Sequence, residues 1–185
     1  MKQTKFTLHP FAARMRGSSR RAQRGASLLE AIAYLGIAAI VVIGAVALLN
    51  GAFSSAGTNE LAEQVNAIQA GVKKLYMGQA NGYTGIGNSV LSSAGVFPST
   101  IPVASGGAAT NTWGGEVTIA SASVGTFTIE YTNVPTSVCI NAITAGGSWT
   151  ALKVNSSTPT LPVTPTAAQT ACSAGNANDI TWTSS

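Results

Sequence analysis

The sequence is poor in charged residues, histidine and cysteine, and each shortage excludes a class of function. Only 9% of the 185 residues are charged, which is about a third of the usual share. The single histidine is His9, so the residues after it contain no Ser/His/Asp triad, and two cysteines are too few for a zinc cluster. A glycine-rich phosphate-binding loop is also missing. We therefore expect neither an enzyme nor a site for a metal or a cofactor.

Positive charge is concentrated at the amino terminus, although the whole chain has a formal net charge of +4 and a pI near 9.3. Seven of the ten basic residues precede residue 26: Lys2, Lys5, Arg14, Arg16, Arg20, Arg21 and Arg24. From residue 26 onward there are three basic and six acidic residues, which gives a formal charge of −3. Nucleic-acid binding needs clustered Lys and Arg, and this body has one adjacent pair. We therefore expect no direct binding of nucleic acid.

A long apolar segment follows the basic region. Ala31–Leu49 contains no charged or strongly polar residue, and its length is close to the roughly 20 residues that cross a bilayer as a helix. Basic residues before such a span place the amino terminus on the cytoplasmic side. A cleaved secretory signal peptide and a permanent anchor both fit this order of segments. Neither accounts for Glu30, because a carboxylate at the edge of an apolar span costs a few kcal/mol to bury.

The junction between the two segments accounts for Glu30. Residues 24–30 read R-G-A-S-L-L-E and lead directly into the apolar run, and this pattern resembles the processing site of type IV prepilins. The resemblance implies cleavage between Gly25 and Ala26, N-methylation of Ala26, and a role in assembly for Glu30 at mature position five. The long leader resembles that of the type IVb branch, which includes the major pilins of conjugative and enteric pili.

The resemblance also implies where the protein acts and with which partners. The precursor is expected in the bacterial inner membrane, and the mature chain in an extracellular helical fibre of identical subunits that serves adhesion, conjugation or aggregation. The implied partners are a prepilin peptidase, an assembly platform protein, an extension ATPase and an outer-membrane secretin. A minor pilin and a type II secretion pseudopilin share the junction and remain alternatives. A secreted binding protein with an ordinary signal peptide is an alternative of another class, and it would begin near residue 55.

Helical periodicity continues beyond the apolar run. Apolar residues recur at steps of three and four, which predicts one stripe on a helix: Leu61, Val65, Ile68, Val72 and Leu75. Charged and amide residues fall off this stripe: Glu60, Glu63, Gln64, Lys73 and Lys74. The four charged residues among them are expected on a solvated face, or in contacts between subunits whose heads pack side by side. The pattern predicts a single helix from about Ser27 to about Met77, with its first half apolar all round.

The remaining sequence indicates a head built on a sheet. Residues 79–112 read as a loop region with a short helix near 88–93. Strands are predicted at 116–119, 126–131, 149–154 and 179–183, whereas 138–143 fits a helix or a strand. An antiparallel sheet packed on the second half of the helix follows, which is an α+β fold shared by the pilin family. The expected parts are a cleaved leader at 1–25, an apolar transmembrane and polymerisation helix at 26–55, and a globular head at 56–185.

Cys139 and Cys172 both lie in this predicted head. A head carried across the membrane reaches an oxidising compartment, where a bridge between them would add about 3.5–4 kcal/mol on the loop-entropy model. The bridge would enclose a proline-spaced segment, 158–165, that is too irregular for a sheet. Pilins of this family carry a C-terminal disulfide loop at a comparable place. Free buried thiols are the alternative, and a metal site is disfavoured since no histidine is near.

Overall fold

A computed structural model of the chain describes residues 27–185, which fall into two compact units. The described part of the first unit is 27–43, and the second unit is Gly44–Ser185. The leader predicted at 1–25 lies outside the described residues, and so does Ala26. The predictions of cleavage after Gly25 and of N-methylation at Ala26 therefore stay predictions.

One helix, α1 (Leu28–Tyr76), accounts for nearly all of the described first unit and for the start of the second. Ser27 caps it, because its hydroxyl oxygen accepts a hydrogen bond from the backbone N–H of Glu30 at 3.2 Å. The helix continues through Gly51 and Gly57 without a break. Each glycine has an alanine beside it, and the high helix propensity of alanine offsets the low propensity of glycine. The prediction of a single helix over about 27–77 is confirmed.

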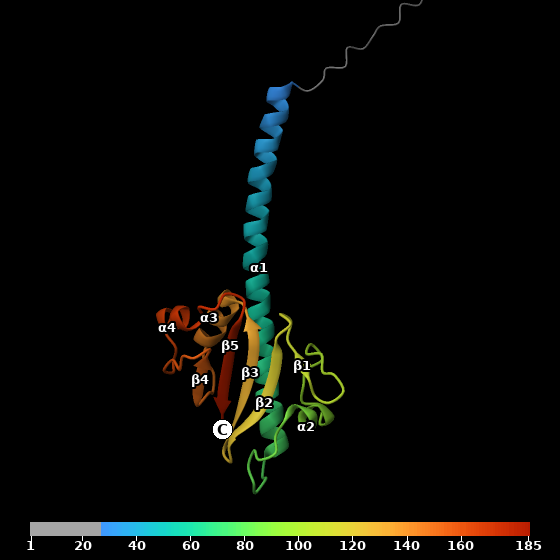
Figure 1. The fold of residues 1–185 in the computed structure, drawn as a ribbon, viewed down its shortest axis with the longest axis vertical. Helices are drawn as coiled ribbons and strands as arrows, with labels where there is room; N and C mark the ends of the chain where they lie inside the picture. The colour runs from blue at the N-terminus through green and yellow to red at the C-terminus, as the bar shows by residue number, and fades with distance from the viewer. Residues whose placement is uncertain (1–26) are drawn as a thin grey trace, which may run out of the picture. The chain divides into compact units, whose positions relative to one another are not determined.

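The second unit contains a five-stranded antiparallel sheet with the strand order β1-β2-β3-β5-β4 (Figure 1). Its strands are β1 (Ala109–Thr110), β2 (Glu116–Ser123), β3 (Thr126–Val134), β4 (Ala151–Val154) and β5 (Asn178–Ser184). Every second side chain is buried in β5 and in β3 as far as Tyr131, as the alternating sequence predicts, and Ile129 lies opposite Trp182. The alternation breaks at the irregularity between Tyr131 and Val134. The antiparallel α+β fold is confirmed.

Three short helices complete the second unit: α2 (Asn88–Ser93), α3 (Thr136–Thr144) and α4 (Pro165–Ala171). The short helix expected near 88–93 is α2, and the ambiguous segment 138–143 is helical, within α3. The sequence reasoning did not predict β1 or α4. For α4 a start signal is present, because Thr164 accepts a hydrogen bond from the backbone N–H of Ala167 at 3.3 Å and Pro165 occupies the first turn.

The second half of α1 packs against the sheet, behind which it lies in Figure 1. Four members of the predicted stripe are buried: Leu61, Val65, Ile68 and Val72. They share one core with the inward residues of the strands, including Phe127, Ile129 and Tyr131. The stripe prediction is wrong at Leu75, which is 37% exposed because it lines an open groove with Gly71 and Val96.

Candidate assembly helix

The first part of α1 carries an apolar surface that no other residue in 27–185 covers. Its large apolar side chains range in exposed fraction from 50% for Val46 to 82% for Leu28. They are Leu28, Leu29, Ile32, Tyr34, Leu35, Ile37, Ile40, Val41, Val42, Ile43, Val46, Leu48, Leu49 and Phe53. Within the described chain, α1 is the one helix long and apolar enough to cross a membrane. So large an exposed apolar surface is typical of a contact with lipid or with another protein.

Glu30 is the single charged residue of this surface, and it lies in the first turn of α1. Ser27 and Glu30 occupy the positions of a capping box, in which an acidic residue also favours the positive end of the helix dipole. The Tyr34 hydroxyl, one turn further along, donates a hydrogen bond to Glu30 Oε1 at 3.3 Å. The side chain is exposed, so the carboxylate can also accept from a donor outside the described residues.

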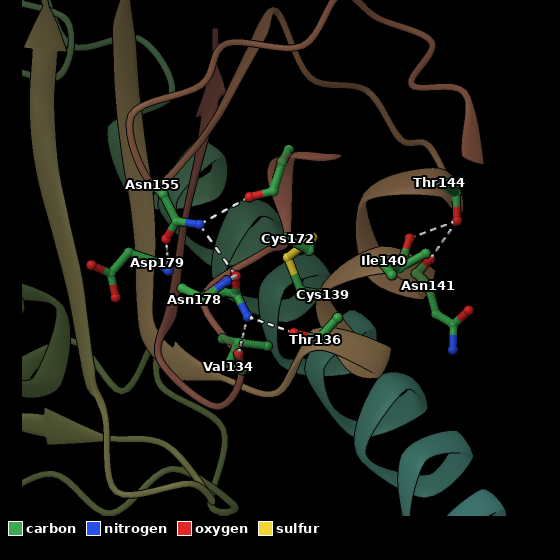
Figure 2. The surroundings of a disulfide bond; sticks show 12 residues. Val134, Thr136, Cys139, Ile140, Asn141, Thr144, Asn155, Cys172, Asn178 and Asp179 are labelled. Atoms are coloured by element: carbon green, nitrogen blue, oxygen red, sulfur yellow. Dashed lines mark hydrogen bonds between the residues drawn. A yellow bond between two sulfur atoms is a disulfide. The ribbon is translucent and has the colours of Figure 1, made fainter. Parts of the chain in front are cut away.

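A disulfide joins Cys139 on α3 to Cys172 at the end of α4, with the two Cα atoms 6.0 Å apart (Figure 2). Both cysteines are fully buried. The bridge closes a loop with a sequence separation of 33, which includes β4 and the proline-spaced segment before α4. The C-terminal disulfide loop of the predicted fold is therefore present.

Two asparagine side chains beside the disulfide connect the surrounding loops (Figure 2). Asn178 is fully buried, and its Nδ2 donates to the backbone oxygens of Val134 at 3.0 Å and Gly175 at 2.8 Å. Asn155 Nδ2 donates to the oxygen of Ala171 at 2.9 Å and to Asn178 Oδ1 at 3.2 Å. The sequence reasoning missed both residues. Asn155 has a φ of 53°, a conformation that asparagine adopts more readily than most residues, but this is visible only in the structure.

A comparison with protein-family models decides the family. The model described as PilS N terminal matches residues 55–185. The chain belongs to this family of type IVb pilins. The match begins beyond the apolar run, so it rests on the pilin head and is independent of the R-G-A-S-L-L-E pattern. A search among curated proteins finds no match to the pilin.

The residues singled out from the pilin sequence lie in different parts of the chain. Glu30 belongs to the first unit, whereas Cys139 and Cys172 belong to the second. Gly25 and Ala26 lie outside the described residues. The pilin thus has an exposed apolar helix surface that includes Glu30 and, in its other unit, a buried disulfide.

A polar network that the sequence reasoning did not predict links α1 of the pilin to its sheet. Gln64, which the periodicity places off the apolar stripe, is buried, and Glu60, which was expected on a solvated face, is only partly exposed. Gln64 is 2% exposed, and its Oε1 accepts from the Tyr131 hydroxyl at 3.3 Å while its Nε2 donates to Glu60 Oε1 at 3.0 Å. Glu60 Oε1 also accepts from the Thr112 hydroxyl at 2.7 Å. Burial, and secondly the charge of Glu60, raise the pKa of Tyr131 above its ordinary value.

Proposed function

We propose that the pilin is cleaved after Gly25, is held in the inner membrane by its amino-terminal helix, and polymerises through that helix into an extracellular fibre. The observation that carries the proposal is the exposed apolar surface of α1 with Glu30 as its single charge. Lipid and a bundle of like helices are similarly apolar surroundings, so one segment can serve both states. The proposed parts are the leader at 1–25, the membrane and polymerisation helix at 26–55, and the head at 56–185.

Glu30 is proposed to set the register between neighbouring subunits. Cleavage would leave the amine of Ala26 as a cation four residues before the Glu30 carboxylate. In the fibre, Glu30 of one subunit would meet the Ala26 amine of the next, and the two charges would neutralise each other away from water. The hydrogen bond from Tyr34 lowers the cost of burying the carboxylate before that neighbour arrives. Such a pair adds little net stability, but it can fix the position of one sliding apolar helix against another.

The machinery that acts on the pilin is proposed from the type IVb systems that its sequence resembles. A prepilin peptidase would remove the leader, and an assembly platform protein and an extension ATPase would draw the subunit out of the membrane. An outer-membrane secretin would pass the fibre to the cell surface, where it would serve adhesion, conjugation or aggregation.

Two measurements test this proposal. Mass spectrometry of the mature amino terminus should give N-methylated Ala26, and a start beyond Leu49 would instead indicate an ordinary signal peptide and overturn the proposal. Glu30→Gln keeps the size of the side chain and removes its charge, so processing should continue while the amount of sheared fibre falls at least about tenfold. Glu63→Gln, at an exposed position on the same helix, is the matched control and should assemble normally. Normal fibres from Glu30→Gln would remove the role assigned to Glu30.

The composition of the purified fibres distinguishes a major from a minor subunit. A major pilin should make up nearly all the protein of purified fibres, and quantitative mass spectrometry of the fibre measures that share. A trace amount would favour the minor-pilin alternative.

A further inference from the structure

Phe53 and Trp113 lie together in the second unit, where the apolar part of α1 ends. The Trp113 ring packs on α1 at Gly57, since a Cβ built on that glycine would lie 3.0 Å from Trp113 Cζ2. Phe53, one turn earlier on the helix, is 70% exposed. Both aromatic residues line the same open groove of about 290 Å³. Neither has a part in the proposed processing or in the pairing at Glu30.

The loop that carries Trp113 is held firmly to the sheet. Asn111 is 5% exposed, and its Oδ1 accepts from the backbone N–H groups of Trp113 and Gly115, each at 2.9 Å. Its Nδ2 donates to the oxygen of Thr132 on β3 at 2.7 Å. A large, partly exposed indole is therefore presented on a fixed loop, and little conformational entropy is lost when a partner binds it.

The spacing along α1 indicates which partner this surface fits. From Ala31 to Phe53 the helix rises about 33 Å, which is close to the roughly 30 Å thickness of the hydrocarbon core of a bilayer. When Ala31 lies at one boundary of the membrane, Phe53 therefore lies at the other. Trp is enriched at this depth because its ring is apolar while its N–H is polar.

The distribution of charged residues around the Phe53–Trp113 groove also bears on its placement at the membrane interface. The basic residues of the described chain are Lys73, Lys74 and Lys153, and none of them lines the groove. The nearest acidic residue along α1, Glu60, accepts hydrogen bonds from side chains of the head. No charged residue lines the groove itself, and the exposed carboxylate nearest to Trp113 along the chain is Glu116, three residues further on.

We propose that Phe53 and Trp113 form an anchor that seats the head of the precursor on the outer surface of the inner membrane until the subunit is extracted. The inference rests on the proposed membrane-held precursor and adds to it a definite orientation of the head. The partner proposed for the Phe53–Trp113 surface is the headgroup region of the membrane. A second copy of the chain is the alternative partner, and the experiment below distinguishes the two.

The experiment uses full-length pilin labelled with 5-fluorotryptophan in nanodiscs of phosphatidylethanolamine and phosphatidylglycerol. The three ¹⁹F signals are assigned with single Trp→Phe variants, and a lipid with a nitroxide on its headgroup is then added. Trp149 and Trp182 are internal controls, because they line a pocket with α1 near Val65, about 12 Å further along the helix than Gly57. The signal of Trp113 should broaden at least about tenfold more than either control signal, because it alone lies at the interface.

A Tyr34→Trp variant tests membrane insertion itself. Its additional signal should broaden when the nitroxide is placed on the acyl chain. If that signal broadens but Trp113 responds no more than Trp149, the anchor is wrong and the membrane helix stands. If neither responds, the membrane-held precursor fails as well. A Trp113 signal that changes with pilin concentration and ignores the labelled lipid would show contact with a second copy, and it would also overturn the anchor.

Discussion

At the scale of single residues, Tyr131 links the helix to the sheet and makes the head sensitive to alkali. Its phenol is fully buried on β3 and donates to Gln64 of α1. Because its pKa is raised in the folded chain, the folded state holds the phenolic proton more tightly than the unfolded state does. This contribution to the free energy of unfolding is complete below the unfolded pKa of about 10 and is lost as the pH rises toward the folded pKa.

We expect Tyr131→Phe to change both the stability of the head and its pH dependence. At neutral pH the variant leaves the Gln64 oxygen without its donor, which should cost about 1–2 kcal/mol. Above pH 10 the wild-type free energy of unfolding should fall by up to about 1.4 kcal/mol per pH unit from this residue, and the variant should lack that decline. Urea unfolding between pH 7 and pH 11.5 measures both effects. Parallel pH profiles for the two proteins would contradict the assignment.

Gln64, Tyr131 and Asn178 show which features of the head could not be predicted from the sequence. The helical apolar run could be predicted because its signal lies in contiguous residues, whereas processing at the R-G-A-S-L-L-E pattern stays a prediction. The position of Gln64 could not be predicted, since its polarity suggests solvent and only the phenol of Tyr131, from a strand far along the chain, explains its burial. Asn178 is a comparable case, because its amide holds carbonyl groups of segments that are separate in the sequence.

At the scale of elements, periodicity predicted what is long or regularly alternating. Apolar spacing predicted the second half of α1 and strands β2 and β3, and the unbroken apolar run predicted the first half of α1. Helix α2 and strands β4 and β5 were also expected, although without a spacing argument. Strand β1 has only two residues, too few for an alternating pattern, and it exists because β2 offers it a partner. Helix α4 follows a proline-spaced segment, and its Thr-Pro start signal went unrecognised although it was readable.

Close packing between elements gives a second prediction, at Gly71 of α1. A Cβ at this position would lie 2.6 Å from Val96 Cγ1, which is too close for either group to remain in place. Alanine favours helix over glycine by up to about 1 kcal/mol, but we expect overpacking to outweigh this gain and Gly71→Ala to destabilise the head by about 1–2 kcal/mol. Thermal and urea unfolding of the disulfide-intact protein measure the difference.

Two variants control for this result. Asn66→Ala changes an exposed position of the same helix and should be neutral or slightly stabilising, since it improves only helix propensity. Val96→Ala removes the methyl group that Gly71→Ala would strike, so the double variant should be more stable than the sum of the single effects predicts. Additive effects would show that the close approach at Gly71 is unimportant.

At the scale of the whole molecule, the exposed and the buried apolar residues of the pilin's α1 lie almost entirely in separate stretches of the helix. Apart from Leu75, the exposed large apolar residues of α1 precede residue 54, and the residues that it buries in the head begin at Leu61. The family match starts at residue 55, between these two sets. The first set makes no contribution to the core of the head, whereas the second belongs to that core. Folding of the head should therefore be independent of the exposed apolar segment.

A chain of residues 55–185 tests this independence. It keeps every buried residue of α1, all five strands and the disulfide, and its first residue, Ser55, is a good helix cap. Without the exposed apolar run it should be soluble without detergent and monomeric in analytical ultracentrifugation. Its melting temperature should lie within about 5 °C of that of the full-length head in detergent, since the removed residues contribute nothing to the core. A truncated chain that is unfolded or oligomeric under oxidising conditions would mean that the apolar segment also stabilises the head, and the predicted independence of the head from that segment would be wrong.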